Sequence, residues 1–170
     1  MATLTPHEVA EAILACAADV VTDVNRICVV PGEIAWDECE CGQLVISEVD
    51  TFPSSDFPLD EVNRTAECGE PWHVVQYTLS LTKCVPVPDS NGNAPTCAQL
   101  AAAAAILSQD KRSVRRAVFC CLQALYDEMD SNNPQIEAFQ LGHSVTIGPE
   151  GQCAGHELTI WVGWTNDCGC

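Results

Sequence analysis

The amino-acid sequence predicts an α+β fold in which a mostly antiparallel sheet is covered by helices on one side. Two amphipathic helical stretches are interleaved with five short stretches of strand character. The last two of these strands are separated by a Gly-Pro-Glu-Gly turn, which is typical of an antiparallel hairpin. The length of 170 residues suits one domain with a single core.

The first predicted helix begins at Pro6 and continues for roughly five turns. Thr5 precedes it as an N-cap, and Glu8 occupies the position that completes a capping box. Apolar residues then recur at helical spacing, namely Val9, Ile13, Ala17, Val20, Val21 and Val24. The helix is therefore expected to pack by one face only.

Five stretches have the length and the Val and Ile content of strands. The third of them alternates apolar and polar residues, which predicts one face wetter than the other. The chain between Phe52 and Pro71 is proline-rich and acidic, and we predict a long loop there. The predicted strands are Arg26–Val30, Gln43–Val49, His73–Cys84, Phe139–Ile147 and His156–Trp164.

The second helical region is predicted from Cys97 to about Met129, after the N-cap Thr96. It opens with an alanine run, and the polar residues from Ser108 to Asp110 predict a bend or break. Its second part carries an apolar stripe at spacings of three and four, made of Val114, Ala117, Val118, Cys121, Leu122, Leu125 and Met129.

The charge and cysteine content restrict the function. With 24 acidic and seven basic residues, the net charge of -17 argues against a grip on nucleic acid. We expect neither a secretory signal nor a membrane span, so the protein should stay in the compartment where it is made.

Twelve cysteines are unusual for a cytosolic protein. A particle that is assembled in a reducing cytoplasm and then lives outside the cell, as a virion does, reconciles these observations.

The cysteines divide into two groups. We expect four of them to be free thiols of the core, because they lie in apolar helix or strand sequence: Cys16, Cys28, Cys120 and Cys121. The other eight lie in loops or at the ends of elements: Cys39, Cys41, Cys68, Cys84, Cys97, Cys153, Cys168 and Cys170.

Three states are open to the second group: disulfides, free thiols, or a zinc site. Cys39-x-Cys41 and Cys168-x-Cys170 together would make a four-thiolate zinc site. We predict one specific disulfide, between Cys84 and Cys97, because the two residues bracket a proline-rich loop between a strand end and a helix start.

No pattern of catalytic residues is found. His7, Glu8 and Glu11 share a helical turn but lack a third ligand, which favours capping and solvation over a metal site. His156 and Glu157 are neighbours in a strand and point to opposite faces. The acidic residues of the long loop lack the spacing of an EF-hand, so we favour a solvated surface over a calcium site. We therefore expect a protein without catalytic activity and without a cofactor.

Four of the seven basic residues lie within six positions, from Lys111 to Arg116. Arg112, Arg115 and Arg116 are expected to share one helix face. They either pair with carboxylates of their own chain or meet an acidic patch on a neighbouring copy. We predict the second arrangement, with the acidic loop that contains Asp56, Asp60 and Glu61 as the other half of the contact.

Four segments resemble a known family. They are RICVVPGEIAWDECECGQL at Arg26–Leu44, RTAECG at Arg64–Gly69, the strand that ends at Cys84, and FCCL at Phe119–Leu122. They resemble neck and tail-completion proteins of long-tailed actinobacterial phages, and the tail terminators in particular. The likeness covers most of the chain, and the PGEIAWD string with its following cysteines is its most specific part.

The resemblance implies a single tail-terminator-like domain over residues 1–170, with a sheet flanked by helices. It implies a structural protein of the virion that forms a ring, expected to be a hexamer, with no catalytic motif. Its partners would be other copies of itself, the tail tube protein and the head-connector or stopper protein, while DNA passes through the lumen without specific binding. A stopper or adaptor ring of the same neck is the alternative, followed by a zinc-binding or redox protein.

Overall fold

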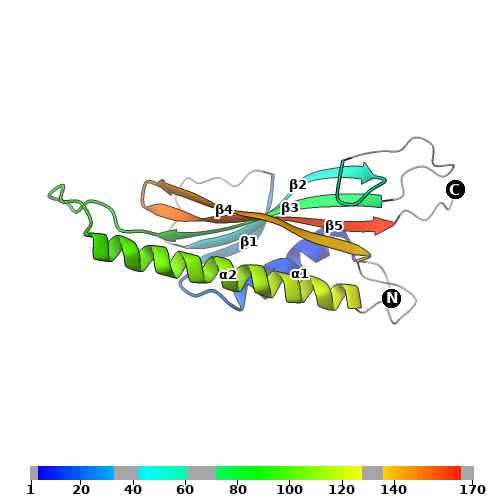
Figure 1. The fold of residues 1–170 in the computed structure, drawn as a ribbon, viewed down its shortest axis with the longest axis horizontal. Coiled ribbons are helices and arrows are strands. Elements are labelled where there is room, and N and C mark those ends of the chain that lie inside the picture. Colours follow the sequence, from blue (N-terminus) through cyan, green and yellow to red (C-terminus); the bar gives the residue numbers. More distant parts are fainter. Residues whose placement is uncertain (1–3, 33–41, 61–71, 128–135, 166–170) are drawn as a thin grey trace.

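The computed structural model describes residues 4–32, 42–60, 72–127 and 136–165. In these ranges two helices pack on one side of a five-stranded sheet, which confirms the predicted fold class (Figure 1). The elements in chain order are α1 (Pro6–Ala18), β1 (Arg26–Pro31), β2 (Gln43–Ser54), β3 (Trp72–Cys84), α2 (Cys97–Asp127), β4 (Ala138–Glu150) and β5 (Cys153–Thr165).

The sheet has the strand order β1-β2-β3-β5-β4, so β1 and β4 are its two edges. β1 runs parallel to β2, and every other pair is antiparallel. β4 and β5 form the predicted hairpin. In β3, at the centre, Val75, Tyr77, Leu79 and Leu81 are buried in the core against the helices, as their alternation predicts.

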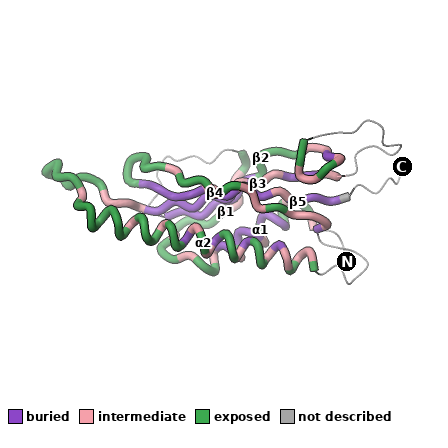
Figure 2. Tube along the Cα trace, viewed as in Figure 1, coloured by how far each residue is buried: buried purple, intermediate pink, exposed green. Residues whose placement is uncertain are grey.

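The core lies between the sheet and the two helices. α1 buries Val9, Ile13 and Ala17, α2 buries Val114, Val118 and Leu122, and these residues pack on the apolar face of β2, β3 and β5. The hydroxyl of Tyr77 donates a hydrogen bond of 2.9 Å to the backbone oxygen of Pro6, which ties the start of α1 to the sheet. Figure 2 shows buried residues along the strands at the centre of the sheet.

α1 is shorter than the predicted helix, which extended to Val24. It ends at Ala18, followed by Asp19 as the C-cap. β-branched residues follow, and they lose side-chain freedom in a helix; Asp23 then adopts a positive φ of 57° that turns the chain. Val21 and Val24 nevertheless pack against the core from outside the helix. The apolar spacing therefore predicted correctly that Val21 and Val24 contact the core, but it placed them wrongly in the helix, and Val20 is 41% exposed.

α2 is continuous over 31 residues, so the predicted break near Ser108 to Asp110 is wrong. Asp110 faces the sheet, and its Oδ2 lies 2.7 Å from the Nζ of Lys83 on β3. The two side chains are only 12% and 9% exposed. A polar residue in the helical stripe thus marks a buried ion pair rather than a helix end.

β2 is longer than predicted and ends at Ser54 instead of Val49. A register shift between Glu48 and Asp50 lets the strand pass its acidic residues and continue to pair with β3. The predicted long loop from Phe52 therefore begins later, and its residues 61–71 lie outside the described residues. Within the described ranges, neither helix combines the length and the apolar character that a membrane span needs.

Because the ion pair between Lys83 and Asp110 is buried, removing one of its partners should lower the free energy of unfolding. Replacing Asp110 with Ala leaves the Lys83 ammonium buried and unpaired, so we expect a loss of about 3–5 kcal/mol in the free energy of unfolding. The double variant Lys83→Met/Asp110→Leu should lose much less, because no charge stays buried. Urea denaturation measures both variants, and equal losses in the two would contradict this interpretation.

His156 lies beside this ion pair and is 2% exposed. Neither of its ring nitrogens has a hydrogen-bond partner among the residues that the structure describes. The pKa of His156 is lowered from 6.5 to about 4, mainly because burial penalises the charged imidazolium. The ammonium groups of Lys111 and Lys83 contribute to this lowering, and the carboxylate of Asp110 opposes it. The folded chain therefore holds a neutral imidazole across the range in which an exposed histidine takes up a proton.

We expect this histidine to make stability depend on pH. Below about pH 6.5 the unfolded chain binds a proton that the folded chain does not, so the contribution of His156 is lost progressively down to about pH 4, by up to about 3 kcal/mol. The carboxylates titrate in the wild type and in His156→Leu alike. The difference between their unfolding free energies should therefore change with pH, and parallel curves would rule the effect out.

Candidate functional site

An arginine of α2, Arg115, is hydrogen-bonded to the backbone of the edge strand β4. β4 is interrupted in its pairing with β5 between Leu141 and Ser144. Gly142 lies in this irregularity, where an added Cβ would come within 2.5 Å of the ring of Trp161. The guanidinium of Arg115 on α2 donates to the carbonyl oxygens of Gly142 at 2.7 Å and of Leu141 at 3.4 Å. These bonds fix α2 to the outer strand.

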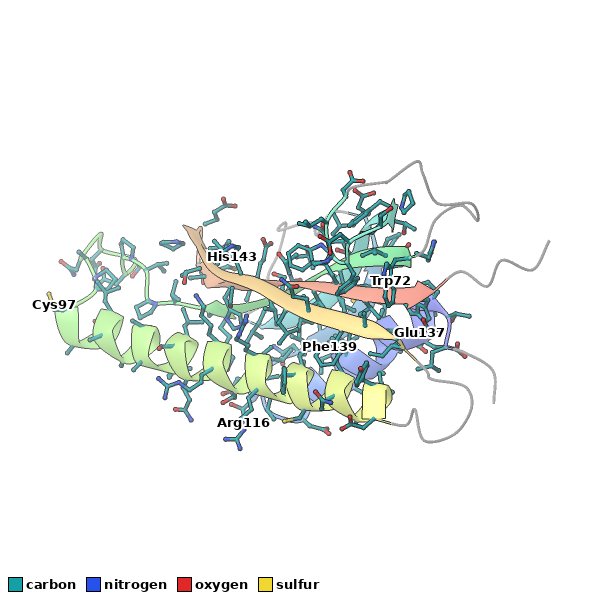
Figure 3. All side chains as sticks on the ribbon, turned by 45° about the vertical axis from the view of Figure 1, so that its right-hand side comes forward. Trp72, Cys97, Arg116, Glu137, Phe139 and His143 are labelled. Carbon is teal, nitrogen blue, oxygen red and sulfur yellow. A yellow bond between two sulfur atoms is a disulfide. The ribbon has the colours of Figure 1, made fainter. Side chains whose placement is uncertain are left out.

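A groove opens next to this anchor, between α2 and β4, with a volume of about 540 Å³. We call it the β4 groove. Phe119 forms part of its wall, is 49% exposed and meets Phe139 edge-on at a ring distance of 5.7 Å. Arg116 points from α2 away from the sheet, and Phe139 lies on β4 (Figure 3). The groove is lined by Arg112, Arg115, Arg116, Phe119, Phe139, Gln140 and Leu141.

The three predicted arginines therefore do share one face, as the sequence indicated. Arg112 and Arg116 are exposed, and neither forms an ion pair with any residue that the structure describes. Pairing within the chain is thus not seen in the described ranges, and contact with a neighbouring copy stays a prediction. Two free guanidinium groups beside aromatic rings suit an acidic protein surface, because each planar fork engages a carboxylate at two points.

The predicted acidic half of the contact lies elsewhere on the chain. Asp56 and Asp60 are exposed and follow β2, which is separated from β4 by β3 and β5. The backbone N–H of Asp56 donates to Ser54 Oγ at 3.1 Å, so this turn is ordered from within. Glu61 lies outside the described residues.

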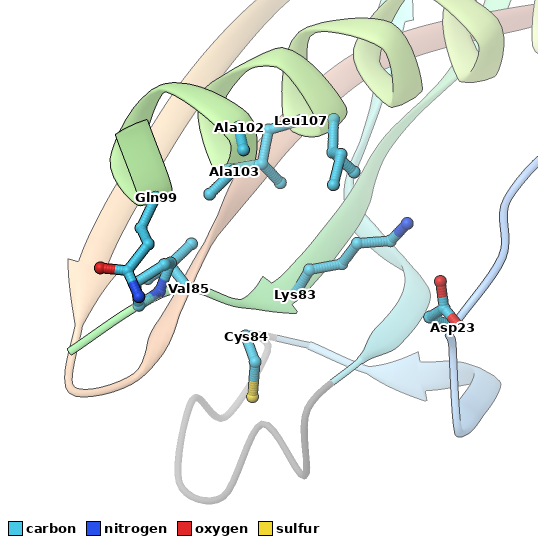
Figure 4. Close-up of a pocket in the computed structure, with 10 residues that line it drawn as sticks. Asp23, Lys83, Cys84, Val85, Gln99, Ala102, Ala103 and Leu107 are labelled. Carbon is cyan, nitrogen blue, oxygen red and sulfur yellow. The ribbon is translucent and has the colours of Figure 1, made fainter. Parts of the chain in front are cut away.

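A second cavity, of about 420 Å³, lies between the first half of α2 and the end of β3 (Figure 4). Its helix wall includes Ala102, Ala103 and Leu107, and its floor includes Val85. Lys83 also lines it, although its ammonium group is already paired with Asp110. The alanine run was the signal in the sequence for this wall, but its partner on β3 could not be read from the sequence.

The structure corrects two predictions about cysteines. Cys16 of α1 and Cys121 of α2, which we expected to be free core thiols, form a disulfide with a Cα–Cα distance of 6.2 Å. Cys120 is free but exposed, and Cys28 is free and half-buried. Two neighbouring cysteines of one helix thus differ in role because successive positions point about 100° apart.

The predicted disulfide between Cys84 and Cys97 is wrong. Cys97 is an exposed free thiol at the start of α2, as Figure 3 shows, whereas Cys84 is engaged in a disulfide of its own. The strand alternation explains the error, because Lys83 faces α2 and Cys84 therefore points to the other side of the sheet. Figure 4 shows the sulfur of Cys84 directed away from α2.

The remaining predictions about ligands have mixed outcomes. The capping interpretation of the first helix is confirmed, since Thr5 and Glu8 form a capping box and His7 Nε2 lies 3.5 Å from Glu11 Oε1. No three His, Cys, Asp or Glu side chains in the described ranges are placed to share a metal. The zinc and disulfide candidates Cys39, Cys41, Cys68, Cys168 and Cys170 lie outside those ranges.

No protein-family model matches the chain, and no curated protein matches its sequence.

We expect the Cys16–Cys121 disulfide to stabilise the fold strongly. It links residues 105 positions apart, and in the chain-entropy model a loop of this length contributes about 4–5 kcal/mol. The variant Cys16→Ala/Cys121→Ala should therefore unfold at lower urea concentration under oxidising conditions. Cys97→Ser/Cys120→Ser, which removes only free thiols, is the matched control. Equal midpoints for the two variants would contradict the assignment.

Proposed function

We propose that this chain is a structural protein of a phage virion, a ring-forming tail terminator that caps the tail tube and joins it to the head connector. The resemblance of its quoted segments supports the family. The fold supports it too, because the resemblance implies a sheet flanked by helices and the chain has five strands with both described helices on one face. The observation that carries the proposal is the pair of exposed arginines of the β4 groove, Arg112 and Arg116, which form no ion pair with the described residues.

Electrostatics explains why that observation matters. A chain with a net charge of -17 repels its own copies on average. A ring requires that each copy present two different and complementary patches. In the β4 groove, Arg112 and Arg116 supply positive charge without a partner in the described chain, next to the exposed ring of Phe119. This groove is therefore suited to one side of a contact between subunits.

The same charge agrees with passage of DNA through a ring. An acidic lumen offers phosphate groups no binding site, so DNA slides without being held. A nucleic-acid grip would need many clustered Lys and Arg on an open surface. Among the described residues of α2, only Arg112 and Arg116 supply exposed and unpaired positive charge, because Arg115 is engaged by β4. The proposal thus assigns DNA to the lumen as a passing molecule.

Deleting this gene from the phage tests the proposal. We expect particles with tails of uncontrolled length, or heads that never join tails, because a terminator stops tube growth and provides the joint. Supplying the wild-type protein from a plasmid is the control and should restore normal particles. Normal particles in its absence would refute the proposal.

A cryo-EM map of the whole particle separates the terminator from its alternatives. We expect the chain as a ring between the last ring of the tail tube and the head connector. A position nearer the head would identify a stopper or adaptor instead, and a position at the tail tip or in the capsid shell would exclude the neck altogether.

A further inference from the structure

The two edges of the sheet differ in charge because a different helix lies beside each. α1 contacts β1 and β2, whereas α2 contacts β4 and β5, and the two helices lie side by side. On α2 the side toward the β4 edge carries Arg112, Arg115 and Phe119. On α1 the exposed residues of the first turns are His7, Glu8 and Glu11. One edge is therefore basic and aromatic, and the opposite edge is acidic.

A second groove lies at the acidic edge, between α1 and β1, with a volume of about 260 Å³. We call it the β1 groove. Its apolar floor is the end of β1, and its rim carries the exposed carboxylate of Glu48 from β2. The carboxylate of Glu11 lies 3.5 Å from His7, so it stands at the same rim. The groove is lined by His7, Ala10, Val29, Val30, Pro31 and Glu48.

We propose that the β4 groove of one copy receives the β1 edge of a second copy, so that Arg112 and Arg116 pair with the second copy's Glu11 and Glu48. Phe119 then covers the apolar end of that copy's β1. This inference rests on the proposed function, because it names the contact from which the ring is built. It also replaces the acidic loop after β2 as the partner of the arginines.

Three features favour a second copy as the occupant. The grooves have complementary charge, and each combines that charge with an apolar surface. Both lie at the boundary between the helix layer and the sheet, so two copies that meet edge to edge bring them to the same level. The contact is also head-to-tail, since each copy offers its basic β4 groove to one neighbour and its acidic β1 groove to the other. Such contacts repeat until a ring closes.

Charge reversal tests the contact with two variants, Arg112→Glu/Arg116→Glu and Glu11→Arg/Glu48→Arg. Each places like charges across the proposed interface, so we expect each to weaken self-association by roughly a hundredfold. An equal mixture of the two should recover wild-type assembly, because every junction in an alternating ring again joins opposite charges. Sedimentation velocity over a range of protein concentrations measures the oligomer, and circular dichroism verifies folding.

The matched control is Asp127→Arg/Glu150→Arg, which reverses two exposed carboxylates outside both grooves and should assemble like the wild type. If the groove variants also assemble like the wild type, or if the mixture fails to recover assembly, the proposed contact is wrong while the ring proposal stands. If the wild type itself stays monomeric at every concentration, both proposals fail.

Discussion

The structure depends on the mismatch in length between a helix and a strand. A strand rises about 3.3 Å per residue and a helix 1.5 Å, so the 13 residues of β3 span about 43 Å, whereas the 13 residues of α1 span about 20 Å. Of the two described helices only α2, with 31 residues and about 46 Å, is long enough to match the sheet. The face of the sheet is therefore covered by two helices over one half and by one helix over the other (Figure 1).

This arrangement divides the layer between helices and sheet into two regions. Under both helices the contacts are apolar, with Ile13, Tyr77 and Val118 fully buried. Under α2 alone they become polar: Lys83 pairs with Asp110, and Lys111 Nζ donates to Thr146 Oγ1 at 3.4 Å. A single helix leaves water access at its sides, which is where long amphipathic side chains can bury their stems and keep a polar end satisfied. The helix-facing side of the sheet thus makes apolar contacts where both helices cover it and includes charged side chains where α2 alone covers it.

The strands and the arginine face could be predicted from the sequence because both follow local periodicity. Asp110 was misread as a helix break because its partner Lys83 comes from β3, and no local pattern reveals that pairing. The disulfide between Cys16 and Cys121 was missed for the same reason, since 105 residues separate the two. In the β4 groove the arginines were found, but Phe139 and its neighbours were not, because their place depends on the register of β4.

Most described basic residues already interact with groups of their own chain, and this restricts how two copies can contact each other. Among the described basic residues, Lys83 is held by Asp110, Lys111 by Thr146 and Arg115 by two carbonyl oxygens. Arg26 pairs in register with Gln43, whose neighbour Leu44 faces the helices, so Arg26 points to the other side of the sheet. Of the described basic residues, only Arg112 and Arg116 then remain on the helix side to attract an acidic surface. Other orientations of two such acidic chains bring like charges together, so repulsion disfavours wrong contacts while the two arginines favour one.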